Sequence, residues 1–274
     1  MGDWTRPERR FSKIGQRLLT AAVLIPIGLW VVWSGAWPLA VACAAFAAVM
    51  AWEWAGMSGH PRAAWLCTAA ALFCLVLPLQ TSWLQAFAGM AGLAFAVVGT
   101  PGGAENRSRA VFGLVYVTAM AAALWWLREG PWDGRAAALY FMSFVWASDA
   151  AAYFTGRGLG GPRLLPQESP NKTWSGGFGA VLVTCVAGYA AADLEQVAPI
   201  IWLVAAALIS VTAQAGDLLE SGLKRRFKVK DSSGLLPGHG GVLDRVDGLG
   251  AVAVVASLAL WLIPALRTAM GLTQ

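Results

Sequence analysis

Carboxylates and cations gather densely between residues 216 and 248. Four aspartates of this region, Asp217, Asp231, Asp244 and Asp247, stand among lysines and arginines. Asp244 and Asp247 are three residues apart, so on a helix both project from one face. Hard carboxylate oxygens without nearby cysteine indicate magnesium, which usually binds one or two carboxylates together with substrate phosphates. The alternative is that these aspartates only cap helices and match their dipoles. For four aspartates amid so many cations we favour a metal and phosphate site.

The same region also carries donors for phosphate. The basic run from Lys224 to Lys230 is followed by Pro237-Gly-His239-Gly-Gly241, a flexible segment whose backbone amides can approach an anion closely. Nucleotidyl and phosphoryl transfers rely on positioning and charge neutralisation, which this mixture of charges can supply. The alternative for the basic run is a patch attracted to anionic lipid. Both interpretations hold if the substrate is itself an anionic lipid.

A second polar region extends from residue 149 to residue 177. Asp149 lies within an apolar segment, where a carboxylate usually faces a bundle interior or a water-filled cavity. The alternative is an interhelical pair with a basic residue. Further along, Ser169 to Trp174 offers a hydroxyl, an amide, a cation and a second hydroxyl, including Asn171 and Lys172. Such a segment suits a polyphosphate, although it could equally contact lipid headgroups.

The elements that must position these residues are apolar helices. Hydrophobic residues make up 58% of the 274-residue chain and charged residues only 13%, which excludes an ordinary soluble enzyme. Segments near the length needed to cross a bilayer recur along the chain. We therefore predict an all-α, polytopic membrane bundle of about nine transmembrane helices, forming one domain over residues 1–274. The predicted spans are Leu18–Trp33, Trp37–Trp54, Ala63–Leu79, Trp83–Val98, Val111–Leu127, Ala136–Phe154, Gly177–Ala192, Ile200–Leu219 and Leu249–Leu266, with polar loops at about 155–176 and 220–248.

Basic residues predict the orientation of these spans. With nine spans, only Arg128, Arg135 and Arg267 fall on one side, and the other 17 of the 20 Lys and Arg fall on the opposite side. Because the basic side faces the cytoplasm, we expect a multi-pass protein of the inner membrane with its N-terminus and polar loops in the cytoplasm. The net charge of +5 is explained by these loops, so no nucleic-acid partner is predicted. The four cysteines lie in apolar runs and suggest neither disulfides nor a zinc site.

The polar region near the C-terminus matches a known signature. Its residues are Ser221-Gly-Leu-Lys224-Arg225, then Lys230-Asp231, then Leu236-Pro-Gly-His239-Gly-Gly-Val-Leu-Asp244-Arg245-Val-Asp247. This pattern resembles the signature of the phosphatidate cytidylyltransferases, or CDP-diacylglycerol synthases. The resemblance extends to Gly216–Ser221 and to Ser169–Trp174. Ser175 departs from the pattern, since many relatives have Glu there, which puts an essential acid at that position in doubt.

The resemblance implies transfer of CMP from CTP to phosphatidate, with CTP, phosphatidate and the lipid bilayer as partners and Mg²⁺, with room for a second cation, as cofactor. It implies that Asp217 and Asp244 ligate the metal, with Asp231 and Asp247 close by in the catalytic set together with Lys224 and Arg225. The side chains expected to hold the phosphates of the two substrates are Asn171, Lys172, Ser221, Lys224, Arg225, Ser232, Ser233, His239 and Arg245, and Asp149 is expected to contact substrate.

Two other functions remain open from the sequence. A CTP-dependent polyprenol kinase shares the membrane setting and the nucleotide, but it would release CDP instead of pyrophosphate. A transporter could use Asp149 and the aspartate cluster as ion sites, although transporter sites usually lie near the bilayer midplane and this cluster lies at segment ends. A homodimer is a further prediction that rests only on general packing of membrane helices.

Overall fold

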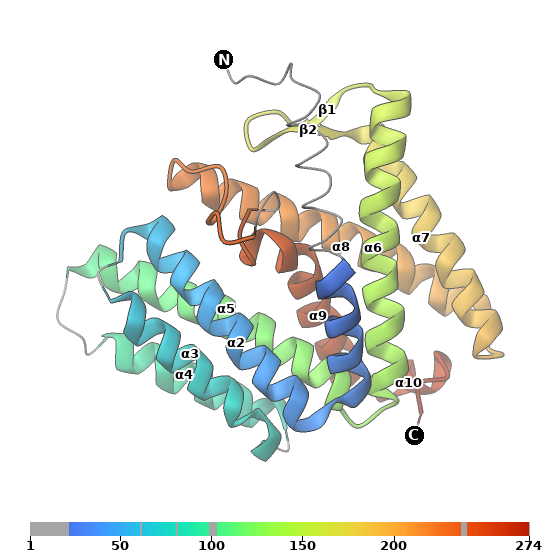
Figure 1. Ribbon diagram of the computed structural model, residues 1–274. Coiled ribbons are helices and arrows are strands. Elements are labelled where there is room, and N and C mark those ends of the chain that lie inside the picture. The colour runs from blue at the N-terminus through green and yellow to red at the C-terminus, as the bar shows by residue number, and fades with distance from the viewer. Residues whose placement is uncertain (1–21, 61, 81, 99–102, 237–239, 274) are drawn as a thin grey trace.

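The structure, a computed structural model, describes residues 22–60, 62–80, 82–98, 103–236 and 240–273. It is helical apart from one small hairpin, which confirms the predicted all-α class (Figure 1). After a first helix over Ala22–Ser34, the elements are α2 (Ala36–Ser58), α3 (Ala63–Leu75), the short 3-10 helix η1 (Leu77–Leu79), α4 (Trp83–Val98), α5 (Ala104–Glu129), α6 (Gly134–Leu159), β1 (Arg163–Leu165), β2 (Ser169–Thr173), α7 (Trp174–Leu194), α8 (Pro199–Arg226), α9 (Leu243–Leu262) and α10 (Pro264–Ala269).

Several helices are long and apolar enough to cross a membrane. Among the described residues these are α2, α5, α7, α8 and α9, five helices of 20 to 28 residues, against about 20 residues needed for a bilayer core. The helices over Ala22–Ser34, Ala63–Leu79 and Trp83–Val98 are apolar but shorter. A multi-pass helical protein is therefore supported, whereas the count of nine spans stays a prediction.

The helices form two groups that meet along α5 and α9 (Figure 1). One group contains α2 to α5 and the other contains α6 to α9. Glycines allow close contacts within each group. A Cβ at Gly113 of α5 would lie 2.0 Å from Nε1 of Trp54 in α2, and a Cβ at Gly216 of α8 would lie 2.8 Å from the carbonyl oxygen of Asp247 in α9. Small residues at such contacts are typical of helix packing in membranes.

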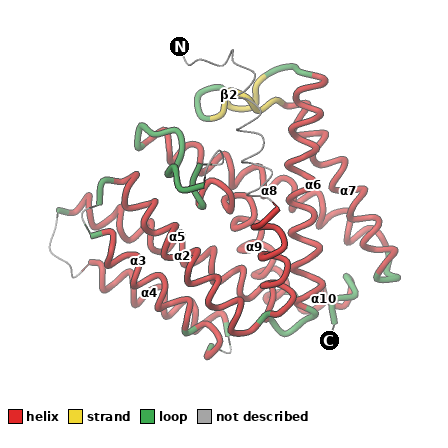
Figure 2. Tube along the Cα trace, viewed as in Figure 1, coloured by secondary structure: helices red, strands yellow, loops and turns green. Residues whose placement is uncertain are grey.

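The polar segments lie at one end of the bundle. The β1–β2 hairpin and the connection between α8 and α9 lie near each other there (Figure 2). The three arginines that were assigned to the other side lie at the opposite end. There Arg128 Nε donates to the carbonyl oxygen of Val32, Arg267 Nη1 donates to that of Pro131, and the Arg135 guanidinium lies 4.6 Å from the Trp33 ring centroid. Among the described residues, these three arginines are thus separated from the polar segments, as the sequence indicates.

Most helix boundaries differ from the predicted spans by one to seven residues, and two of these differences change where the predicted site residues lie. Helix α8 continues to Arg226 instead of ending at Leu219, and α9 begins at Leu243 instead of Leu249. A span predicted from hydropathy ends where charged residues begin. The backbone hydrogen bonds of a helix can continue through a charged, amphipathic turn. The described residues that connect the two helices are therefore 227–236 and 240–242, called the α8–α9 loop below. Ser221, Lys224 and Arg225 consequently lie on α8, not in a loop.

Candidate active site

A cavity of about 450 Å³ brings the two polar regions together. It lies between α6, β2, α7, α8 and α9, and most of its charged lining was predicted from the sequence. The predicted site residues on its wall are Asp149, Asn171, Lys172, Asp217, Lys224, Asp231, Asp244, Arg245 and Asp247. Residues far apart in the chain thus line one space at the polar end of the bundle.

Helix α6 and strand β2 form one wall of this cavity. Asp149 lies on α6 and is accessible to the cavity. Strand β2 carries Asn171 and Lys172 and runs directly into α7, whose N-terminus is capped by Thr173, because Thr173 Oγ1 accepts a hydrogen bond of 3.1 Å from the amide of Gly176. A Cβ at Gly176 would lie 2.8 Å from the carbonyl oxygen of Ala152. This glycine therefore lets α7 begin against α6, which fixes β2 beside the cavity.

Lys172 and Asp217 connect the hairpin to helix α8. Lys172 Nζ lies 2.5 Å from Asp217 Oδ2, and both side chains remain partly exposed. Ser221, one turn further along α8, donates from Oγ to Asp217 Oδ1 at 3.4 Å. The predicted side chains Asp217 and Ser221 are therefore on one face of α8, as the spacing of four residues requires.

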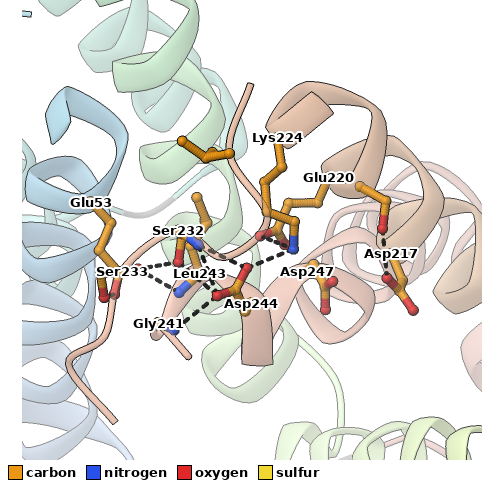
Figure 3. Close-up of polar contacts among 12 residues, drawn as sticks. Glu53, Asp217, Glu220, Lys224, Ser232, Ser233, Gly241, Leu243, Asp244 and Asp247 are labelled. Atoms are coloured by element: carbon orange, nitrogen blue, oxygen red, sulfur yellow. Dashed lines mark hydrogen bonds and ion pairs between the residues drawn. The ribbon is translucent and has the colours of Figure 1, made fainter. Parts of the chain in front are cut away.

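Lys224 joins α8 to α9. Its ammonium lies 2.6 Å from Asp244 Oδ1 and 3.3 Å from Glu220 Oε1 (Figure 3). All three side chains are largely buried, with exposed fractions of 11% for Lys224, 5% for Asp244 and 1% for Glu220. A buried cation between two carboxylates avoids the high cost of an unpaired buried charge. The sequence pattern contains Glu220, but its pairing with Lys224 was not predicted.

Asp244 also organises the α8–α9 loop. Its Oδ2 atom accepts hydrogen bonds from the Ser232 amide at 3.0 Å and the Gly241 amide at 2.8 Å, and it lies 3.0 Å from the Ser232 hydroxyl, whose one proton is also within reach of Glu53. These donors come from both halves of the loop. Oδ1 faces Lys224 and is also 3.3 Å from the Ser232 amide. Asp244 therefore holds the loop closed over the start of α9.

Glu53 of α2 is a site residue that the sequence reasoning missed. Its side chain is buried, and it accepts hydrogen bonds from the hydroxyls of Ser232 and Ser233 and from the amides of Val242 and Leu243 (Figure 3). A signal was present in the sequence, because Glu53 is the one acidic residue between Ala36 and Ser58. A charge inside an apolar segment indicates function, and Glu53 meets this criterion as Asp149 does.

The remaining predicted residues lie around the cavity or outside the described part of the chain. Ser232 and Ser233 contact Glu53, and Arg225 Nη1 donates to the carbonyl oxygen of Val229 at 3.1 Å, at the exposed end of α8. Ser175, at the position where Glu was expected, donates from Oγ to the carbonyl oxygen of Gly160. His239 lies outside the described residues.

The charges of the cavity suit a cation shared with phosphates. Five carboxylates and three cationic side chains line it, an excess of negative charge that a polyphosphate would increase. The two predicted metal ligands each have an ammonium group against them, Lys172 at Asp217 and Lys224 at Asp244, so both positions attract positive charge. Among the described residues, no three His, Cys, Asp or Glu converge on a point where they alone could hold a metal ion. This pattern fits magnesium, which takes one or two carboxylates and completes its shell with phosphate and water.

Comparisons with known proteins agree with this chemistry. The profile of the cytidylyltransferase family matches residues 15–263. A phosphatidate cytidylyltransferase of Brucella suis is 39% identical over 257 residues, which cover 90% of this chain and 93% of the relative. Proteins of the same name from Pseudomonas aeruginosa and Staphylococcus epidermidis are each 34% identical. Those alignments cover 90% and 71% of this chain, and 96% and 78% of the respective relatives.

Proposed function

The chain belongs to the cytidylyltransferase family, and we propose that it transfers CMP from CTP to phosphatidate, giving CDP-diacylglycerol and pyrophosphate. The observation that carries this assignment is the single cavity that gathers Asp149, Lys172, Asp217, Lys224 and Asp244, with others of the predicted set, at the end of an apolar helix bundle. A polar cavity at the end of membrane helices gives a soluble nucleotide and a lipid headgroup access to the same charges.

The cationic side chains would bind the phosphates. Lys172, Lys224 and Arg245 reach the cavity from β2, α8 and α9, so they can approach a polyphosphate from three sides. Lys172 and Lys224 are paired with carboxylates in this structure. A divalent cation on Asp217 and Asp244 would release both ammonium groups toward phosphate oxygens. Magnesium bound there would neutralise charge that develops on the transferring phosphate and the pyrophosphate.

The reaction needs no nucleophile from the protein. A phosphomonoester loses its second proton with a pKa of about 6, so phosphatidate is largely dianionic at neutral pH. One of its oxygens forms the new bond to the α-phosphorus of CTP, and the bond between that phosphorus and the α,β-bridging oxygen breaks to release pyrophosphate. The chain's contribution is to align the two anions and offset their repulsion, since positioning and electrostatics dominate such transfers.

The proposed orientation in the membrane is based on the distribution of Lys and Arg between the two ends of the bundle. The cavity lies at the end where most Lys and Arg occur, so we place that end in the cytoplasm of a bacterial inner membrane. One chain supplies all of the charged residues of the cavity described above. The proposed reaction therefore needs no residue from a second chain, and the homodimer stays a prediction.

The assignment is tested with purified protein, CTP, phosphatidate and Mg²⁺. Equal amounts of pyrophosphate and CDP-diacylglycerol are expected, and at limiting Mg²⁺ the yield of both products should fall together in Asp217→Asn. The matched control is Asp193→Asn, which changes an exposed aspartate at the other end of α7. Release of CDP with a polyprenol acceptor would instead identify a lipid kinase, and ion flux without turnover of either lipid would identify a transporter.

A further inference from the structure

Glu53 is a buried carboxylate whose hydrogen bonds to described residues are with the α8–α9 loop and the start of α9. It is 1% exposed and lies near the end of α2, in the other helix group from the cavity. Its two oxygens accept from Ser233 Oγ at 2.6 Å, Leu243 N at 2.7 Å, Val242 N at 2.8 Å and Ser232 Oγ at 3.2 Å. These four donors are neutral, so within the described part of the chain the carboxylate is held by hydrogen bonds from neutral groups.

Two of those donors are amides at the N-terminus of α9. The first amides of a helix have no partner within the helix and carry part of the positive end of its dipole. The residue before α9 is Val242, which provides no side-chain cap. Glu53 therefore caps α9 from a different helix, and the position of α9 depends on α2.

The neighbouring residue, Trp54, holds the other end of the same loop. The ring of Phe227, the first residue after α8, meets the Trp54 ring edge-on at a centroid distance of 5.4 Å. Trp54 is itself buried, and its Nε1 donates to the carbonyl oxygen of Arg109 in α5. Consecutive residues of α2 thus contact the beginning and the end of the α8–α9 loop.

The contacts of Glu53 continue into the cavity. Ser232 Oγ lies within hydrogen-bonding distance of both Glu53 Oε2 and Asp244 Oδ2, and Asp244 Oδ1 meets the Lys224 ammonium (Figure 3). Polar contacts therefore run without a gap from α2 through the loop to α9 and α8. A change in Glu53 is transmitted to the two charged side chains at the cavity wall through one serine.

We propose that Glu53 is a positioning residue of the active site, which fixes the α8–α9 loop and the first turn of α9 so that Asp244 and Lys224 face the substrates. This inference rests on the proposed cytidylyl transfer for its effect on activity, but not for its effect on the loop. Glu53 does not line the cavity. Its role is to preorganise groups that do, and small displacements of such groups cost about 100-fold in rate.

The experiment combines amide hydrogen exchange with kinetics on Glu53→Gln, Glu53→Asp and Ser58→Ala. The Gln side chain turns one acceptor into a donor that faces amide and hydroxyl donors, so exchange within residues 229–243 is expected to accelerate about 10-fold or more. Exchange in α7 should stay at the wild-type rate. Ser58 is the matched control, because it is buried on the same helix and its hydroxyl has no hydrogen-bond partner among the residues that the structure describes.

The kinetic readout separates positioning from general stability. At saturating CTP and Mg²⁺, and well below the unfolding temperature, kcat of Glu53→Gln should fall about 10- to 100-fold, while Ser58→Ala stays near wild type. Glu53→Asp keeps the charge on a shorter side chain, so its kcat should lie between those of Glu53→Gln and Ser58→Ala. If Glu53→Gln does not fold, the same two readouts on Glu53→Asp decide the question.

Wild-type exchange rates in residues 229–243 of Glu53→Gln would overturn the proposal, as would acceleration spread evenly over the whole chain. Wild-type kcat with a loosened loop would also overturn it, since the loop would then not position catalytic groups. Failure of the wild-type protein to transfer CMP would reject the proposed function instead, and the exchange data would still test whether Glu53 holds the loop.

Discussion

Lys172 of strand β2 and Asp217 of helix α8 form an ion pair across the cavity, with Nζ and Oδ2 2.5 Å apart. The pair links the two polar regions of the sequence and is the contact through which the hairpin meets α8. Its side chains are 26% and 40% exposed, so solvent weakens the attraction and the pair contributes little to stability. Its location on the cavity wall indicates a role in binding.

Lys172→Met should therefore lower activity without lowering stability. We expect kcat/KM for CTP to fall about 10- to 100-fold, since one charge-assisted phosphate contact is lost, and the unfolding free energy to change by less than about 1 kcal/mol. The matched control is Glu129→Gln, which removes the charge of the Arg128–Glu129 pair at the opposite end of the bundle. A large drop in the thermal midpoint of Lys172→Met, or activity loss in the control, would contradict this account.

Lys224→Met, in contrast to Lys172→Met, should lower the stability of the fold. The change leaves Glu220 and Asp244, which are 1% and 5% exposed, without their cation. Removing one partner of a buried ion pair costs about 3–5 kcal/mol. Thermal unfolding in detergent should show a clear decrease in midpoint. Equal midpoints for wild type and Lys224→Met would show that the buried charges need no partner.

Two glycines of the α8–α9 loop provide a steric test of the loop's conformation. A Cβ at Gly241 would lie 1.9 Å from Ser232 Oγ and 2.4 Å from Glu53 Oε1, whereas a Cβ at Gly234 would meet no atom of the described residues within 4 Å. Gly241→Ala should therefore displace the loop and reduce kcat about 100-fold, and Gly234→Ala should retain wild-type activity. Steady-state kinetics on both variants, with their thermal midpoints, measures this difference. Similar activities in the two variants would mean that the loop does not adopt this conformation during turnover.

The sequence predicts which residues line the site better than it predicts the contacts that hold them in place. The charged residues on the cavity wall were identifiable because charges stand out against apolar helices and their spacing matches a known signature. The contacts of Glu53 could not be derived in the same way, because Glu53 and Leu243 are distant in the chain and meet only through the packing of α2 against the loop. The extension of α8 to Arg226 was also missed. Hydropathy reports where a helix leaves an apolar environment, but not where its hydrogen bonds end.

Asp217 and Asp244 should both contribute to magnesium dependence, and to different extents. Within the described part of the chain, Asp217 Oδ1 has one hydrogen bond, of 3.4 Å with Ser221, and Oδ2 faces Lys172, so Asp217→Asn should raise the Mg²⁺ concentration for half-maximal activity about 10- to 100-fold. Asp244 in addition binds the loop through Ser232 and Gly241, so Asp244→Asn should raise the Mg²⁺ requirement and also lower kcat at saturating Mg²⁺. Mg²⁺ titrations of both variants, with Asp193→Asn as control, measure these effects. An unchanged Mg²⁺ requirement in Asp244→Asn would assign Asp244 to the loop alone, because loss of a ligand must weaken metal binding whatever else the residue does.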